Sequence, residues 1–239
     1  NGAGKTSLFN CISGFYRRML GGAPLLFVRS PPGNKESVPK EDSMTLRNTG
    51  HRWGWVSQLL HWLILAMLAW LGWRGLTMVD MDPSPAMIEA YALHKSVGLT
   101  LLALVALRLA WRLFAGSPRP VPGTPTWQKR MADLTHAALY VLMFAIPLSG
   151  WLFNSASGYP LQWFKLFNLP AIAGSSEALA DLASQVHVVG FWLLVLLVAA
   201  HAGAALYHHF VQRDDTLRHM LPQRRRAPGP IQQTPGGMA

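Results

Sequence analysis

The sequence predicts an all-α fold in which four transmembrane helices form a bundle with both termini in the cytoplasm. Three observations lead to this fold class. The chain contains four long apolar runs, hydrophobic residues make up 51% of it, and charged residues make up only 13%. That charged fraction is about half the average of soluble proteins. The ten tryptophans fit the same class, because tryptophan gathers at membrane interfaces.

Each of the four runs is long enough to span a bilayer. An apolar helix needs about 20 residues to cross a hydrocarbon core of about 30 Å. The runs show little polar face, which argues against a soluble helix bundle. Pro147 lies inside the third run and is tolerated there, because neighbouring groups in a membrane bundle satisfy the carbonyl that it frees. The predicted spans cover residues 55–73, 92–114, 131–153 and 186–210.

The distribution of basic residues predicts the orientation of the spans. Lysine and arginine are concentrated before the first run, between the second and third runs, and after the fourth. The other two loops are acidic or mixed, so the positive-inside rule places both termini in the cytoplasm. The net charge of +10 therefore fits a membrane topology, and we expect no nucleic-acid partner. The long outer loop, 154–185, is rich in aromatic residues and is predicted to lie on the membrane surface as a short amphipathic helix.

The first 43 residues differ in character from the rest of the chain. Asn1 to Ser7 match the back half of a P-loop, and the stretch through Arg17 resembles the nucleotide-binding subunit of ATP-binding cassette transporters. A working P-loop needs a preceding strand, a first glycine and a later acidic strand, so we expect no ATP binding here. The predicted organisation is a disordered or mis-joined leader over 1–43, a membrane domain over 44–223 that starts at Met44, and a disordered basic tail over 224–239.

Histidines inside the runs are the candidate functional residues, because an ionisable side chain within a span is costly. His187 and His201 lie fourteen residues apart on the fourth run. This spacing places them within about 40° of one helix face and about 21 Å apart along the axis. One such face suits two stacked cofactors, one toward each membrane surface. The other histidines in the runs are His61, His94 and His136.

Matching the depths of the histidines gives two pairs of candidate metal ligands. A haem iron takes two axial ligands, and bundle cofactor sites draw their ligands from facing helices. Depth pairs His94 with His187 on the outer side and His61 with His201 on the inner side. His136 also lies on the inner side, so depth alone leaves it as an alternative partner of His201. As a non-ligand, His136 would hydrogen-bond a haem propionate, serve a quinone or relay protons.

Other residues narrow the nature of the cofactor. The one cysteine, Cys11, lies outside the apolar runs, and no Cys-X-X-Cys-His motif is present. These facts exclude an iron–sulfur cluster held by cysteines and a covalently attached haem. Small residues close to the candidate ligands would leave room for a flat porphyrin; they are Gly98, Gly190 and Gly203. Cationic residues that would neutralise haem propionates, or else snorkel from helix ends, are Lys95, Arg108 and Arg112.

Four segments resemble the bacterial cytochrome b561 family: Gln58 to Trp62, His94 to Gly98, His201 to His209, and Arg213 to Pro222. The resemblance covers about residues 51–223, and the leader before Met44 departs from the family pattern. It implies a four-helix inner-membrane protein with two non-covalent haems b and electron exchange with quinone. Some members oxidise superoxide and pass its electron to quinone. By position, the implied iron ligands are His61, His94, His187 and His201.

The predicted function is electron transfer across or along the bacterial inner membrane, with membrane lipid, quinone and a redox protein as partners. A haem iron with two histidine ligands has no open position for a substrate, and no catalytic residue is predicted. If the protein is an enzyme, we expect a quinone-linked oxidoreductase of the superoxide oxidase type. The alternative is a haem-bearing membrane anchor of a larger dehydrogenase or hydrogenase. A proton- or metal-transporting bundle would need carboxylates within the spans, and Asp133 alone lies there.

Overall fold

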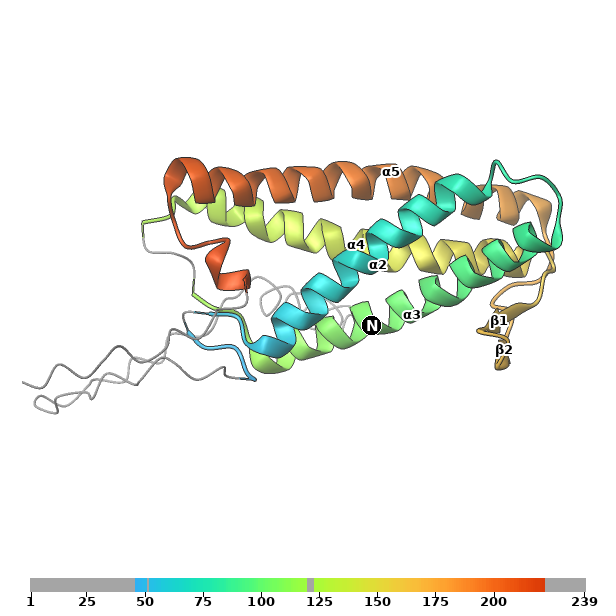
Figure 1. The fold of residues 1–239 in the computed structure, drawn as a ribbon, viewed down its shortest axis with the longest axis horizontal. Coiled ribbons are helices and arrows are strands. Elements are labelled where there is room, and N and C mark those ends of the chain that lie inside the picture. The colour runs from blue at the N-terminus through green and yellow to red at the C-terminus, as the bar shows by residue number, and fades with distance from the viewer. Residues whose placement is uncertain (1–45, 51, 120–122, 222–239) are drawn as a thin grey trace, which may run out of the picture.

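A computed structural model describes residues 46–50, 52–119 and 123–221 (Figure 1). These residues contain four helices that are long and apolar enough to cross a membrane. They are α2 (Trp55–Met78), α3 (Pro85–Ala115), α4 (Thr126–Ala156) and α5 (Glu177–Tyr207), and α5 continues as the π-helix η1 (His208–Gln212). The predicted all-α fold with four spans is confirmed. The predicted leader over 1–43 and tail over 224–239 lie outside the described residues.

Three of the helices, α3, α4 and α5, begin before the apolar runs that predicted them. α3 begins after Ser84, whose hydroxyl accepts a hydrogen bond from the Met87 amide at 3.2 Å. α5 begins in the same way after Ser176, whose hydroxyl accepts from the Leu179 amide at 3.4 Å. Such caps satisfy amides that have no partner in the first helical turn. Hydropathy alone therefore locates each apolar span but not the residue at which its helix begins.

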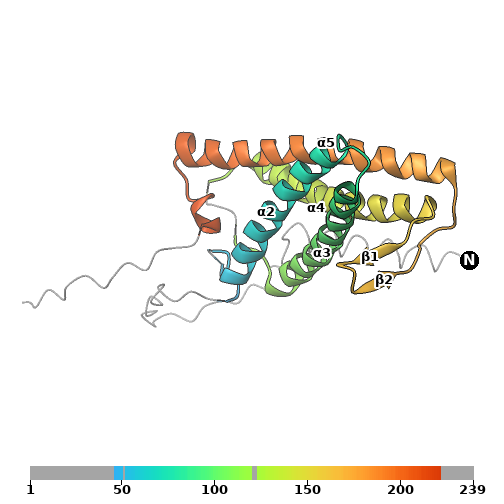
Figure 2. The same ribbon diagram turned by 45° about the vertical axis from the view of Figure 1, so that its right-hand side comes forward.

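The helices associate mainly as two pairs. α4 packs along α5, α2 packs against α3, and a smaller α3–α4 contact joins the pairs. Figures 1 and 2 show α5 running alongside α4 while α2 crosses the bundle obliquely. Buried apolar side chains fill the middle of the bundle, and Val105 is completely inaccessible. The buried cluster comprises Ile64, Leu71, Leu101, Val105, Leu139, Tyr140, Met143 and Leu194.

The prediction of an amphipathic helix in the outer loop is wrong. The loop forms an antiparallel hairpin of β1 (Leu161–Trp163) and β2 (Phe167–Leu169), with Trp163 opposite Phe167. The apolar residues of both strands alternate with a polar residue, which is the period of a strand and not of a helix. Three hydrogen bonds fasten the hairpin to α3. The Phe164 amide donates to Ser96 Oγ at 2.9 Å, the Ser96 hydroxyl donates to the Gln162 carbonyl at 3.3 Å, and the Trp163 indole donates to Thr100 Oγ1 at 3.0 Å.

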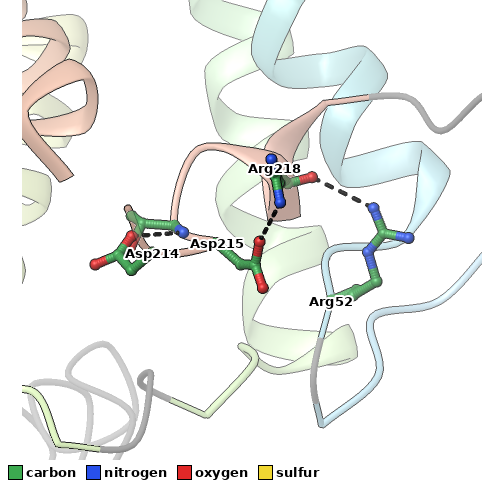
Figure 3. A network of polar contacts seen from close by, with 5 residues as sticks. Arg52, Asp214, Asp215 and Arg218 are labelled. Carbon is green, nitrogen blue, oxygen red and sulfur yellow. Dashed lines mark hydrogen bonds and ion pairs between the residues drawn. The ribbon is translucent and has the colours of Figure 1, made fainter. Parts of the chain in front are cut away.

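At the other end of the bundle, the segment after α5 folds back onto the start of α2 (Figure 3). The Arg52 guanidinium donates to the Arg218 carbonyl at 3.3 Å, and the Arg218 side chain pairs with Asp215 at 3.2 Å. The indole of Trp62 on α2 donates to the Met220 carbonyl at 3.0 Å. The two ends of the described chain therefore lie at the same end of the bundle, which we call the inner end.

Candidate cofactor sites

The histidines of the helices gather at two levels of the bundle. At the outer level, His94 of α3 faces His187 of α5, with ring centres 6.3 Å apart and ring planes at 66°. At the inner level, His61 of α2 faces His201 of α5 at 6.4 Å and 72°. Each pair joins the α2–α3 helix pair to α5 across the bundle. We call them the outer pair and the inner pair.

His136 of α4 belongs to the inner level but stands closer to its neighbour. Its ring centre lies 5.3 Å from that of His201, with the planes at 67°. A metal ion between two imidazoles separates their ring centres by about 6 Å, since each metal–nitrogen bond is about 2 Å and each nitrogen lies about 1 Å from its ring centre. The outer and inner pairs have this spacing. The contact between His136 and His201 is too short for an ion in a straight line between the two rings.

The ring of His187 is oriented by α4. Its Nδ1 lies 2.8 Å from the Ile146 carbonyl and 3.3 Å from the Ser149 hydroxyl. Because a carbonyl oxygen only accepts hydrogen bonds, Nδ1 carries the proton and Nε2 keeps its lone pair for a metal. Metal-binding histidines are commonly oriented by such a bond to a carbonyl. His187 is therefore held in the protonation state that a haem ligand needs.

Two glycines on neighbouring helices leave room for the rings of the outer pair. A side chain at Gly150 of α4 would place Cβ only 3.1 Å from His187 Cε1, and one at Gly75 of α2 would lie 3.3 Å from His94 Cε1. Sequence reasoning missed both glycines. Of the glycines it singled out, Gly190 faces Ile146 of α4, where an added Cβ would lie 3.0 Å from Ile146 Cγ1, so it serves a helix contact. A Cβ added at Gly98 or at Gly203 would have no neighbour within 4 Å.

The outer level also holds two buried polar atoms without a hydrogen-bond partner. They are His94 Nδ1 and Arg74 Nε, and within the described chain no other buried side-chain nitrogen or oxygen is left unsatisfied. An unsatisfied buried polar group costs about 1–3 kcal/mol. Both unsatisfied atoms lie at the level of the outer histidine pair, where a polar group of a bound cofactor would give them hydrogen-bond partners. The residues present therefore fit a haem in three respects: the spacing of the facing imidazole rings, the free Nε2 lone pair of His187, and the two buried polar atoms that lack a hydrogen-bond partner.

The cationic residues singled out from the sequence have different surroundings. Lys95 of α3 donates to Asn154 Oδ1 at 3.0 Å and so ties α3 to the outer end of α4. Arg108 donates to the Tyr140 hydroxyl at 3.3 Å and lies near enough to interact electrostatically with His61, His136 and His201. Arg74, at the outer level, was missed because the first apolar run was ended at residue 73. The apolar residues that follow Arg74 in the sequence indicate that the helix continues beyond residue 73.

Comparison with known proteins gives one consistent result. The family model described as prokaryotic cytochrome b561 matches residues 52–223. The chain is 36% identical to Cytochrome b561 homolog 2 of Escherichia coli strain K12, over 74% of this chain and 95% of that protein. It is 32% identical to Cytochrome b561 homolog 1 of the same organism, over 70% of this chain and 94% of that one. It is 28% identical to the Probable superoxide oxidase CybB of Yersinia pestis, over 70% and 93%. The chain therefore belongs to the prokaryotic cytochrome b561 family, whose members are membrane-bound b-type cytochromes that take part in electron transfer.

Proposed function

We propose that this membrane cytochrome binds two haems b, with His94 and His187 as ligands of the outer haem and His61 and His201 as ligands of the inner one. The spacing of the two facing pairs, 6.3 and 6.4 Å between ring centres, is the observation that carries the proposal. The shorter distance from His136 to His201 favours His61 as the inner ligand. When bound, each haem would supply an iron that takes up and gives back one electron.

The chain's own residues would keep the two sites separate and dry. Ile146 and Ser149 fix the ring of His187, and the glycines beside the outer pair let both rings approach. The apolar cluster around Val105 lies between the two levels and excludes water there. Two histidines at each level would hold the haem iron and leave no coordination position open, so the arrangement suits electron transfer rather than oxygen activation.

We propose quinone as the electron acceptor in the bacterial inner membrane, with superoxide as a donor. The name of the Yersinia pestis relative, probable superoxide oxidase, supports this donor. Two superoxide ions would each lose one electron to become O₂. One quinone would gain these two electrons and two protons to become quinol. The basic residues of the inner end support a cytoplasmic location for that end.

Haem content tests the ligand assignment directly. Purified wild-type protein should show b-type absorbance bands and two haems per chain in a pyridine haemochrome assay. We expect His94→Ala and His61→Ala each to leave one haem, and the double variant His187→Ala, His201→Ala to leave none. His136→Ala is the matched control and should keep two. Full haem in the double variant, or one haem in the His136 variant, would contradict the assignment.

The electron partners need a separate measurement. The haem absorbance of the wild-type protein should report reduction by superoxide and reoxidation by a soluble quinone analogue, with O₂ and quinol formed in a ratio of two to one. Reduction by quinol alone, together with copurification of a soluble dehydrogenase, would instead favour the anchor function.

A further inference from the structure

We propose that Arg74 and Arg108 form two carboxylate-binding sites, one beside each histidine pair, and that each arginine holds the propionate carboxylates of the adjacent haem. This inference rests on the proposed function, because it needs a haem at each pair. It assigns to the two arginines a role that the positions of the histidine ligands do not reveal. Two arginines on different helices would each set the orientation and the reduction potential of one haem.

The environment of Arg74 supplies the first argument. Arg74 lies on α2 one turn before the outer end of the helix, next to Gly75, where an added Cβ would lie 3.3 Å from His94 Cε1. Its Nε is buried and has no hydrogen-bond partner, and Arg74 interacts electrostatically with His94. Within the described residues, no salt bridge joins Arg74 to a carboxylate. Arg74 is half-buried, and its unpaired Nε is a donor to which an anion can hydrogen-bond.

Arg108 is a second half-buried arginine beside a histidine pair, at the inner level. It lies on α3 about two turns before the inner end and interacts electrostatically with all three inner histidines. Its hydrogen bond goes to the neutral Tyr140 hydroxyl, at 3.3 Å. In the part of the chain that the structure describes, no salt bridge involves Arg108, and the nearby Asp133 interacts with Arg112 instead.

A carboxylate is the anion that both positions favour. The planar guanidinium fork matches a carboxylate with two parallel hydrogen bonds, which a lysine ammonium does not provide. A charged arginine within a span is expensive and pairs with a partner or lines a cavity. A haem b carries two carboxylates at one edge, so a haem held by the adjacent histidines brings the missing anion to each arginine. Both arginines lie toward the ends of the bundle, where those carboxylates would reach the membrane surfaces.

Potentiometric titration of the purified holoprotein tests the proposal. A cation beside a haem stabilises the reduced form, so Arg74→Gln and Arg108→Gln should each lower one of the two midpoint potentials. We expect at least a tenfold change in the equilibrium constant for reduction, which equals about 59 mV for one electron. The step moved by Arg74→Gln should be the one that disappears in His94→Ala. The step moved by Arg108→Gln should be the one that disappears in His61→Ala.

Exposed cations at the same ends of the bundle provide matched controls. Lys165, on the outer hairpin, has a side chain that is 71% exposed, and Arg130 is exposed near the inner start of α4. Lys165→Gln and Arg130→Gln each remove one positive charge. Each should change the equilibrium constant for reduction of either haem less than threefold. Resonance Raman spectra add a structural readout, because the propionate bending bands report hydrogen bonding. Those bands should shift in Arg74→Gln and Arg108→Gln and stay in place in the controls.

The possible outcomes separate this inference from the proposed function. Two haems in each arginine variant, with unchanged potentials and Raman bands, would overturn the carboxylate sites and leave the histidine ligands intact. Loss of one haem in a glutamine variant, with retention in Arg74→Lys or Arg108→Lys, supports a charge-dependent site. Equal loss in the lysine and glutamine variants would show a structural role and overturn the inference. A wild-type protein without haem would overturn the proposed function itself.

Discussion

The rings of the outer pair can approach α2 and α4 only where those helices lack a side chain. Gly150→Ala would introduce a Cβ 3.1 Å from His187 Cε1 and 3.2 Å from Nδ1, closer than ordinary contacts. The ring would have to move away from the Ile146 carbonyl that orients it. Because changes in groups that orient a metal ligand cost about 10–100-fold in affinity, we expect roughly tenfold weaker retention of the outer haem. Haem transfer to an excess of apomyoglobin measures this.

Gly174→Ala is the control for the Gly150 variant. Gly174 lies in the loop before α5, and a Cβ there meets nothing within 4 Å. This variant should retain both haems as the wild type does. If Gly150→Ala loses haem no faster than Gly174→Ala, the packing of His187 against α4 is not what holds the outer haem.

Gly75 and Gly150 could not be identified from the sequence as neighbours of the outer histidine pair. Spacing along one helix identifies residues that share a face, so it found Gly98 and Gly190 next to the candidate ligands. It does not reveal which residue of another helix faces a given ring. Gly75 and Gly150 belong to helices that approach the outer pair from the side, and their importance depends on how the helices pair.

At the scale of elements, the outer hairpin was missed because its turn lacks the usual residues. Hairpin turns with positive φ favour glycine, asparagine and aspartate. Here Phe164 and Lys165 adopt φ values of 47° and 61° in that turn. The alternation of apolar and polar residues in both strands would have indicated a hairpin. The aromatic content of the loop led instead to the prediction of a surface helix. Bonds to Ser96 and Thr100 of α3, which sequence reasoning could not foresee, hold this turn.

The fold-back segment at the inner end should depend on pH through Asp214. Burial acts to raise the pKa of this carboxyl, but hydrogen bonds from His208, at 2.6 Å, and from Thr216 outweigh it and lower the pKa. A lowered folded-state pKa contributes stability that is present above the ordinary value, about 3.9, and is lost as pH falls through the folded value. We therefore expect the segment after α5 to resist proteolysis at neutral pH and to become susceptible below about pH 4.

Neighbouring Asp215 provides the comparison for this prediction. Its pair with Arg218 is 60% and 68% exposed, and exposed ion pairs contribute about 0–1 kcal/mol. Asp214→Asn should make the segment susceptible to an acid-tolerant protease already at neutral pH, whereas Asp215→Asn should follow the wild-type curve. Similar curves for both variants would mean that the His208–Asp214 contact does not secure the segment.

At the scale of the whole molecule, sequence alone was sufficient for the number of spans and for the grouping of the histidines at two levels. Both follow from hydropathy and from the rise of a helix, which need no knowledge of neighbours. The proposal of His61 rather than His136 as the inner ligand depends on the packing, since both lie at the inner depth. The structure brings both rings to His201 and separates them by distance, 6.4 Å against 5.3 Å. These distances are set by which helices pack together, and contacts between helices leave no periodic pattern in the sequence.

The orientation of the whole bundle in the membrane is the remaining prediction, and it follows from charge. The inner end carries basic residues before α2, between α3 and α4, and after α5. At the outer end, Asp80 and Asp82 lie in the loop after α2 and Glu89 lies in the first turns of α3. Basic loops are retained in the cytoplasm, so the inner end should face it. Single cysteines introduced in a Cys11→Ser background test this with a membrane-impermeant maleimide. Asp82→Cys, in the loop after α2, should react in intact cells whose outer membrane has been permeabilised. Thr126→Cys, at the start of α4, should react only after lysis, and the reverse pattern would invert the bundle and place the outer pair nearest the cytoplasm.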